Sequence, residues 1–192
     1  MADIFENKLN NFDSDKFLNL ARQYEGYLFP DTYHVLPNTG ERDVVEMMRS
    51  NFDKKILEVQ DEITESGISL KDVIIMASLL EKEAYDIETQ RTIAGILWKR
   101  LEIDMPLQVD AVFLYINGKN TYELTLEDLR ENESPYNTYK YKGLPPGPIA
   151  SPSRDSILAA LNPNKSDYLF YLADRSGNTY YARTFEEHVE NK

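Results

Sequence analysis

Residues 72–84 form a stretch that is almost entirely apolar and yet ends in carboxylates. Counting back from Glu81 in steps of three or four gives Ser78, Ile74 and Leu70. Residues at that spacing share one face of a helix. We therefore expect a helix whose inward face carries Glu81 among apolar neighbours, and other elements of the chain have to cover that face.

The position of Glu81 has two readings. A carboxylate against apolar neighbours is desolvated, which disfavours its charged form and raises its pKa. A raised pKa is what a general acid needs near neutral pH. A glutamate at a helix end is more often solvated or paired on the surface, here with Lys82. The pattern alone leaves both readings open.

Composition narrows the classes of function. The chain has 192 residues, enough for one sizeable domain, and a formal net charge of −12. Such a negative chain lacks the basic surface that nucleic-acid binding requires, and its charge argues against contact of this domain with an anionic membrane surface. There is no cysteine, and His34 and His188 are far apart without a second ligand at helical spacing, so neither a metal site nor a cofactor is expected.

Periodicity and capping residues outline the remaining helices. Apolar residues at helical spacing predict one long helix over residues 41–66, ended by Gly67. Ser69 and Asp72 form a capping box that opens the Glu81 helix. Further helices are expected over about residues 88–101 and 153–161, with short ones after Thr125 and Thr184.

The other segments are less regular. Residues 107–116 fit either a strand or a short helix. Residues 132–152 contain five prolines and several tyrosines, which predicts an ordered, functional loop. Residues 168–173 and 179–182 flank Arg175-Ser-Gly-Asn178, which predicts a β-hairpin. The predicted class is therefore α+β: a mostly helical single domain with a small hairpin and a long Pro/Tyr-rich loop along a groove.

Tyrosine is the unusual residue, with 13 copies, many of them in loops. A tyrosine has a flat apolar face and a hydroxyl, which suits sugar rings, although half-buried packing under loops is an equal alternative. Among carboxylates, Asp110, Glu83 and Glu25 are further candidates beside Glu81. Glu83 lies about 200° around a helix from Glu81, so both cannot point into one cleft.

Several ordered segments together resemble the YceG-like endolytic murein transglycosylases. They are residues 25–33 (EGYLFPDTY), 77–83 (ASLLEKE), 105–110 (MPLQVD), 134–139 (SPYNTY), 143–146 (GLPP), 148–150 (PIA) and 159–163 (AALNP). The resemblance covers residues 24–192, and residues 1–23 are expected to be a lead-in segment. Trp98 and Ala111 depart from the stretches expected in the family.

The resemblance implies endolytic cleavage of the β-1,4 bond between N-acetylmuramic acid and N-acetylglucosamine in peptidoglycan, leaving 1,6-anhydromuramoyl ends. One carboxylate acts first as acid and then as base, so the second carboxylate of most glycosidases is unnecessary. The family's catalytic glutamate is assigned to Glu81, with Glu83 as the alternative. Groove residues expected from the motifs are Gln108, Asp110, Tyr136, Asn137, Thr138, Tyr139, Glu25 and Tyr33.

Membership would also imply a place in the cell. Family members usually carry an N-terminal membrane helix and a LysM-like subdomain, and neither is visible in this sequence. We expect the domain to work on the outer face of the bacterial cytoplasmic membrane, with peptidoglycan strands and cell-wall synthesis enzymes as partners. Alternative functions are a non-catalytic peptidoglycan-binding module, a scaffold for those enzymes, and a hydrolase that pairs Glu81 with Asp110.

Overall fold

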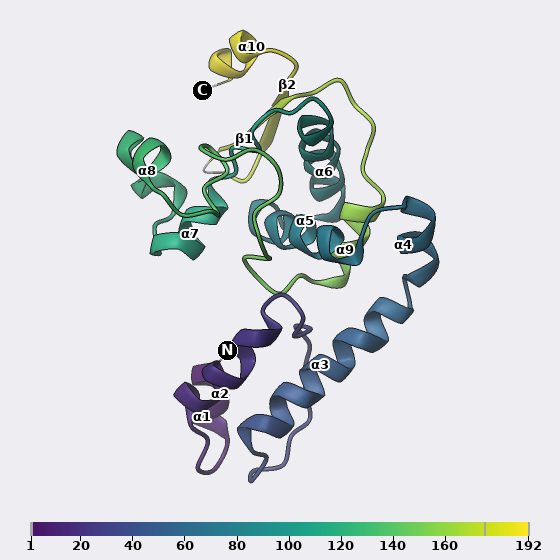
Figure 1. The fold of residues 1–192 in the computed structure, drawn as a ribbon, viewed down its shortest axis with the longest axis vertical. Helices are drawn as coiled ribbons and strands as arrows, with labels where there is room; N and C mark the ends of the chain where they lie inside the picture. Colours follow the sequence, from purple (N-terminus) through teal and green to yellow (C-terminus); the bar gives the residue numbers. More distant parts are fainter. Residues whose placement is uncertain (1, 175, 192) are drawn as a thin grey trace.

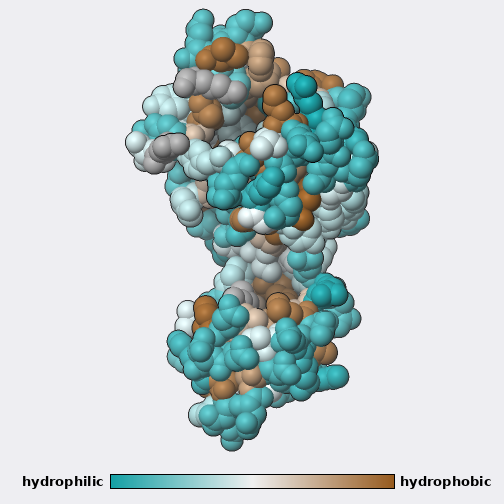
Figure 2. Space-filling model, turned by 90° about the vertical axis from the view of Figure 1, so that its left-hand side faces the viewer, coloured by the Kyte–Doolittle hydropathy of each residue, from teal (hydrophilic) through white to brown (hydrophobic). Residues whose placement is uncertain are grey.

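The computed structural model describes residues 2–174 and 176–191, which form two lobes joined by one long helix, α3 (Glu41–Leu57). Figure 1 shows the smaller lobe at the bottom, built by α1 and α2 against the first part of α3. Figure 2 shows a waist between this lobe and the larger one above it.

The described elements follow one another along the chain with short connections. The helices are α1 (Ala2–Lys8), α2 (Ser14–Ala21), η1 (Arg22–Tyr24), α3, α4 (Gln60–Ser66), α5 (Leu70–Glu83), α6 (Ile87–Glu102), α7 (Ala111–Asn117), η2 (Thr121–Glu123), α8 (Leu126–Glu131), α9 (Arg154–Leu161) and α10 (Phe185–Glu190). The strands β1 (Phe170–Ala173) and β2 (Thr179–Ala182) pair antiparallel between α9 and α10. The predicted α+β class, mostly helical with a small hairpin, is confirmed.

Helix α5 is the centre of the larger lobe, with α9, α6 and α7 packed around it. Every residue from Val73 to Leu80 is buried, so α5 is covered on all sides rather than on one stripe. Ser69 caps the helix by accepting a hydrogen bond from the amide of Asp72 at 3.1 Å, as the sequence predicts. The cap fixes the start of α5, and the burial of residues Val73–Leu80 fixes the rest of the helix inside the larger lobe.

The smaller lobe has a hydrophobic core of its own. Phe12 and Phe17 pack with Val44, Val45 and Met48 of α3, and all five are buried. Residues 1–23, expected to be a lead-in segment, thus supply α1 and α2 to a folded unit, and the predicted boundary at residue 23 lies inside it.

The predicted long helix over residues 41–66 is interrupted. Helix α3 ends at Leu57 and α4 begins at Gln60, with Val59 between them at φ −121° and ψ 18°. Val59 stays buried, and the bend directs α4 against α9 (Figure 1). No proline or glycine lies at the bend, and the contact of α4 with α9 is a tertiary interaction that the local sequence does not reveal.

The undecided segment 107–116 is neither a strand nor a single helix. Residues 105–109 have no regular secondary structure, and α7 begins at Ala111. Gln108 has a left-handed φ of +52°, and its amide donates to the carbonyl of Thr138 at 3.1 Å. A positive φ is costly for a residue with a side chain, so this turn is held by its surroundings.

Two glycines allow backbones to approach closely. A Cβ at Gly95 on α6 would lie 2.1 Å from the carbonyl oxygen of Asn164, and one at Gly26 would lie 2.1 Å from Pro148. Gly26 also has φ +83°. These contacts hold the 25–33 motif and the segment after α9 on the larger lobe.

The hairpin forms where the sequence predicts it. Phe170 pairs with Ala182 and Tyr171 with Tyr181. The predicted turn includes Arg175, which lies outside the described residues. None of the helices in the described part of the chain is long and apolar enough to cross a bilayer.

Candidate active site

A cleft of about 690 Å³ opens beside the C-terminal end of α5. Its walls are the end of α5, residues 108–111, α7 with the following η2 turn, strand β1 and helix α10. These elements meet on one side of the larger lobe in Figure 1, and Figure 2 shows that side hollowed below the apolar residues of α10. A volume in this range suits a ligand of one to a few rings.

Glu83, the last residue of α5, points into this cleft. Its Oε2 accepts a hydrogen bond from the hydroxyl of Tyr171 at 2.9 Å. The pKa of Glu83 is raised to about 7, chiefly by burial and in smaller part by the charge of Asp110, while the hydrogen bonds from Tyr171 and the amide of Ala111 act in the opposite direction. Glu83 is therefore a carboxyl group that exchanges a proton near neutral pH.

Asp110 lies just before α7, next to Ala111, and accepts a hydrogen bond from the hydroxyl of Tyr139. Burial, followed by the neighbouring charge of Asp110, raises the pKa of Tyr139 well above its ordinary value. The pKa of Tyr171 is raised by burial and then by the charge of Glu83. Both phenols therefore stay protonated and act as hydrogen-bond donors to the two carboxylates.

Arg100 closes the inner end of the cleft. Its side chain is buried, and Nε donates to the carbonyl of Leu169 at 2.7 Å while Nη1 donates to the carbonyl of Leu107 at 2.7 Å. Its guanidinium lies over the ring of Phe170, 5.1 Å from the centroid. Arg100 thus joins α6 to the start of β1 and to the turn that carries Gln108 and Asp110.

Glu81 points elsewhere. Its Oε2 accepts hydrogen bonds from the amide of Ser153 at 2.8 Å and from the hydroxyl of Ser156 at 2.6 Å, both in the first turn of α9. A carboxylate at a helix N-terminus is favourably placed by the helix dipole and the free amides. Glu81 is not among the cleft-lining residues, so the two glutamates serve different parts of the molecule, as their 200° separation requires.

The whole chain matches one known protein family. The model of the YceG-like family matches residues 1–192, the whole chain. The chain belongs to the YceG-like family. This confirms the resemblance seen in the sequence motifs, and it extends the match to the first 23 residues.

Named relatives of this YceG-like chain are proteins called endolytic murein transglycosylase. One from Bacillus subtilis is 39% identical over 175 residues, covering 91% of this chain and 48% of the relative. One from Streptococcus pneumoniae is 39% identical over 172 residues, covering 87% of this chain and 31% of the relative. The chain therefore spans 48% and 31% of the lengths of these two relatives.

A solved structure has the same fold. The crystal structure of a YceG-like protein from Listeria monocytogenes is 34% identical and matches with a TM-score of 0.80. The match covers 100% of this chain and 67% of that protein. The arrangement around α5 is thus shared with a crystallised YceG-like protein.

The structure separates the predicted groove residues into two groups. Gln108, Asp110 and Tyr139 line the cleft. Asn137 and Thr138 are buried instead: Asn137 donates to the carbonyl of Leu129 at 3.0 Å, and Thr138 Oγ1 accepts from the amide of Val109 at 3.0 Å. These two residues hold the loop against the 105–109 turn, and their role is to brace the cleft wall.

Tyr136, Glu25 and Tyr33 also lie outside the cleft lining. Tyr136 packs on Tyr115 with centroids 4.8 Å apart, and Tyr115 donates to Glu25 at 2.7 Å. Tyr136, Tyr115 and Glu25 thus connect the 25–33 motif to α7 and to the loop that follows α8. Tyr33 donates to the carbonyl of Phe29 at 2.7 Å and stabilises the turn of its own motif.

Several cleft residues were not identified from the sequence. They are Lys82, Tyr85, Arg100, Leu114, Lys119, Asn120, Thr121, Tyr122, Phe170, Tyr171, Leu172, Ala173, Phe185 and His188. Most belong to β1, α10 and η2, which approach α5 only through the tertiary fold. The one usable signal was the abundance of tyrosine, which does not single out Tyr171.

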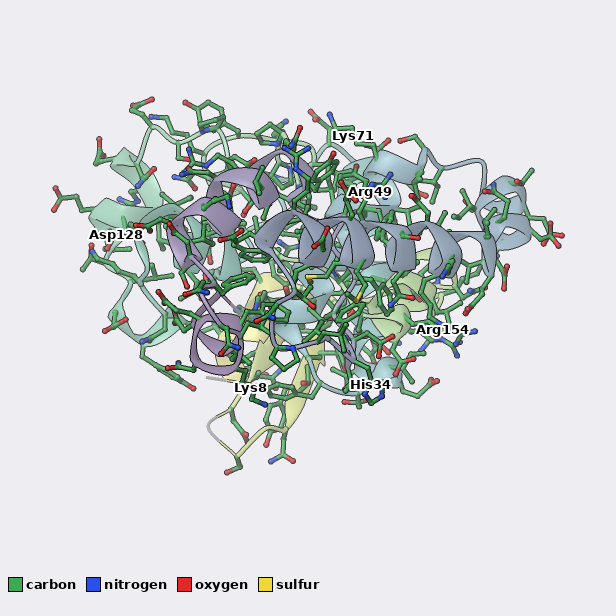
Figure 3. The ribbon with its side chains drawn as sticks, turned by 90° about the horizontal axis from the view of Figure 1, so that it is seen from below. Lys8, His34, Arg49, Lys71, Asp128 and Arg154 are labelled. Atoms are coloured by element: carbon green, nitrogen blue, oxygen red, sulfur yellow. The ribbon has the colours of Figure 1, made fainter. Side chains whose placement is uncertain are left out.

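The described residues hold no group of three or more histidines, cysteines, aspartates or glutamates that could bind a metal. His188 lines the cleft on α10, whereas His34, labelled in Figure 3, lies between Tyr33 and Val35, which pack against the core of the smaller lobe. Within the cleft, the phenols of Tyr171 and Tyr139 donate hydrogen bonds to the carboxylates of Glu83 and Asp110, an arrangement that fits proton transfer.

Proposed function

We propose that this chain is the catalytic part of a peptidoglycan lytic transglycosylase. It would cleave the β-1,4 bond between N-acetylmuramic acid and N-acetylglucosamine within glycan strands and leave a 1,6-anhydro end. The names of the curated relatives support the reaction class. The observation that carries the proposal is a desolvated carboxyl group, Glu83, in a cleft of suitable size.

Glu83 is preferred to Glu81 as the acid. The carboxyl oxygen that carries the proton of a general acid must reach the substrate in the cleft, and Glu83 lines the cleft while Glu81 does not. Glu81 is instead held by hydrogen bonds from two donors at the start of α9. The catalytic role expected for Glu81 is therefore transferred to Glu83, the alternative already named from the sequence.

In the first step, protonated Glu83 gives its proton to the glycosidic oxygen. The bond from that oxygen to C1 of the muramoyl sugar breaks, and positive charge develops at C1. Tyr171 then stabilises the carboxylate that Glu83 becomes, by the hydrogen bond it already donates. The negative charge of Asp110, which lines the same cleft, stabilises the positive sugar.

In the second step, the carboxylate of Glu83 takes the proton from the 6-hydroxyl of the same sugar. The freed oxygen forms the new bond to C1 and closes the 1,6-anhydro ring. Glu83 is protonated again, and no water is consumed. One residue with a pKa of about 7 is well matched to both halves of this cycle.

The test is mass spectrometry of products from purified peptidoglycan incubated with the wild-type chain and with Glu83→Gln. We expect anhydro-ended products from the wild type and a loss of about 10²- to 10⁴-fold in rate in the variant. Glu81→Gln is the matched control, because it makes the same chemical change two residues away. Full activity of Glu83→Gln would contradict the proposal.

Asp110 supports one alternative, a hydrolase in which it activates water. The two carboxylates line the same cleft, and the charge of Asp110 raises the pKa of Glu83. Cleavage in ¹⁸O-labelled water separates the two reactions, since a hydrolase places the label at the new reducing end and a transglycosylase leaves none. If the protein is a binding module, neither the wild type nor Glu83→Gln would give products, and both would still bind glycan strands.

Peptidoglycan lies outside the cytoplasmic membrane, so the proposed reaction places this domain on that side. Cell-wall synthesis enzymes stay a predicted class of partner.

A further inference from the structure

Tyr85 is a fully exposed aromatic residue beside the proposed acid. Its relative exposure is 107%, although it follows Glu83 by only two positions and lines the same cleft. Within the described part of the chain its hydroxyl makes no hydrogen bond. A large aromatic ring without a packing partner carries more information than an exposed aliphatic residue scattered on the surface.

The backbone on both sides of Tyr85 is fixed. The amide of Ala84 donates to the carbonyl of Leu80 at 3.2 Å, and Nε2 of buried Gln90 donates to the carbonyl of Ala84 at 2.9 Å. On the other side, Asp86 caps α6 by accepting from the amide of Thr89 at 2.9 Å. The ring is thus presented from a rigid turn and has only two side-chain torsions to lose on contact with a ligand.

Other apolar side chains continue the rim of the cleft. Leu114 on α7, Tyr122 on η2 and Phe185 on α10 are exposed by 50%, 68% and 59%, and all three line the cleft. The interior of the same cleft is polar, with Glu83, Asp110 and Arg100. A polar floor with aromatic side chains at the rim fits a chain of sugar rings, whose faces are apolar and whose edges carry hydroxyl groups.

We propose that Tyr85 is a stacking platform for a sugar of the glycan strand outside the pair that is cleaved. The inference rests on the proposed function and adds a determinant of substrate length to it. A strand that continues past the cleavage point would gain contact with the ring of Tyr85. A strand that ends at the cleaved pair would gain none.

The experiment compares Tyr85→Ala and Tyr85→Phe on purified, peptide-free glycan strands that have been separated by length. For Tyr85→Ala we expect KM on long strands to rise about three- to tenfold, with kcat unchanged at saturation. On strands that end at the cleaved disaccharide, no change is expected. Tyr85→Phe keeps the ring and should behave as wild type. Tyr141→Ala is the matched control, because Tyr141 is an exposed tyrosine outside the cleft.

Binding is measured separately from turnover, in a Glu83→Gln background. Isothermal titration with the same long strands should show the same three- to tenfold weakening when Tyr85→Ala is added. Equal losses on short and long strands, a defect in Tyr85→Phe, or unchanged binding would each overturn the inference. Absence of products from the wild type would overturn the proposed reaction instead, and the titration would still decide the role of Tyr85.

Discussion

Tyr171 donates a hydrogen bond to Glu83 over 2.9 Å, and the two residues are 88 positions apart in the sequence. The hydroxyl comes from the hairpin strand β1 and the carboxylate from the end of the central helix α5. The protonation of Glu83 therefore depends on how the hairpin sits on the helix.

Removal of this hydrogen bond should shift the pH profile. The bond from Tyr171 lowers the pKa of Glu83, so Tyr171→Phe should raise that pKa above its present value of about 7. The acid must be protonated to act, hence the alkaline limb of kcat/KM should move to higher pH by about one unit. Rate measurements from pH 5 to 9 check this, and a limb that moves to lower pH would contradict the assignment.

Asp110→Asn should move the same limb in the opposite direction. The charge of Asp110 raises the pKa of Glu83, and asparagine removes the charge while retaining an acceptor for Tyr139. We expect the alkaline limb at lower pH and a lower kcat, because the developing positive charge loses a stabilising partner. An unchanged pH profile would show that the two carboxylates do not interact.

The raised pKa of Glu83 also predicts a cost in stability. An unfolded chain releases this proton near 4.5 and the folded protein near 7, so the folded state binds more protons between these values. The free energy of unfolding should therefore fall as pH rises through this window. Glu83→Gln removes the penalty, and we expect it to be more stable than wild type by about 1–3 kcal/mol at pH 8 and little different at pH 4. Urea denaturation at the two pH values measures both effects, and equal stability at pH 8 would contradict the burial of the charge.

In contrast to Glu83→Gln, the variant Glu81→Gln should be less stable than wild type and should keep most of its turnover. It weakens two hydrogen bonds to the first turn of α9 and removes a charge at a helix N-terminus. We expect the free energy of unfolding to fall by about 1 kcal/mol, with kcat within a few-fold of wild type. Thermal denaturation together with product formation checks this, and a loss of turnover equal to that of Glu83→Gln would return the catalytic role to Glu81.

Features set by neighbouring residues could be predicted from the sequence. Ser69, Thr125 and Thr184 each cap a helix by accepting from the amide three positions later, at 3.1, 3.2 and 3.2 Å. The left-handed Gly67 ends α4 as expected. These interactions span only a few residues, so the local pattern contains all the information that they need.

Features set by contacts between residues far apart in the sequence could not be predicted in this way. The bend at Val59 places α4 in contact with α9, and no proline or glycine marks it. The choice between Glu81 and Glu83 depends on Ser153 and Ser156 for the first and on Tyr171 for the second. Helical spacing establishes that the two glutamates diverge, but only the tertiary fold decides which of them faces the cleft.

The smaller lobe has a consequence for anyone who shortens this protein. Phe12 and Phe17 cover Val44, Val45 and Met48 on a helix that continues into the larger lobe. A chain that began at residue 24 would keep every residue of the cleft and would expose that apolar face of α3 to water. Such a fragment should associate with itself, and its loss of activity would then reflect aggregation rather than a missing catalytic group.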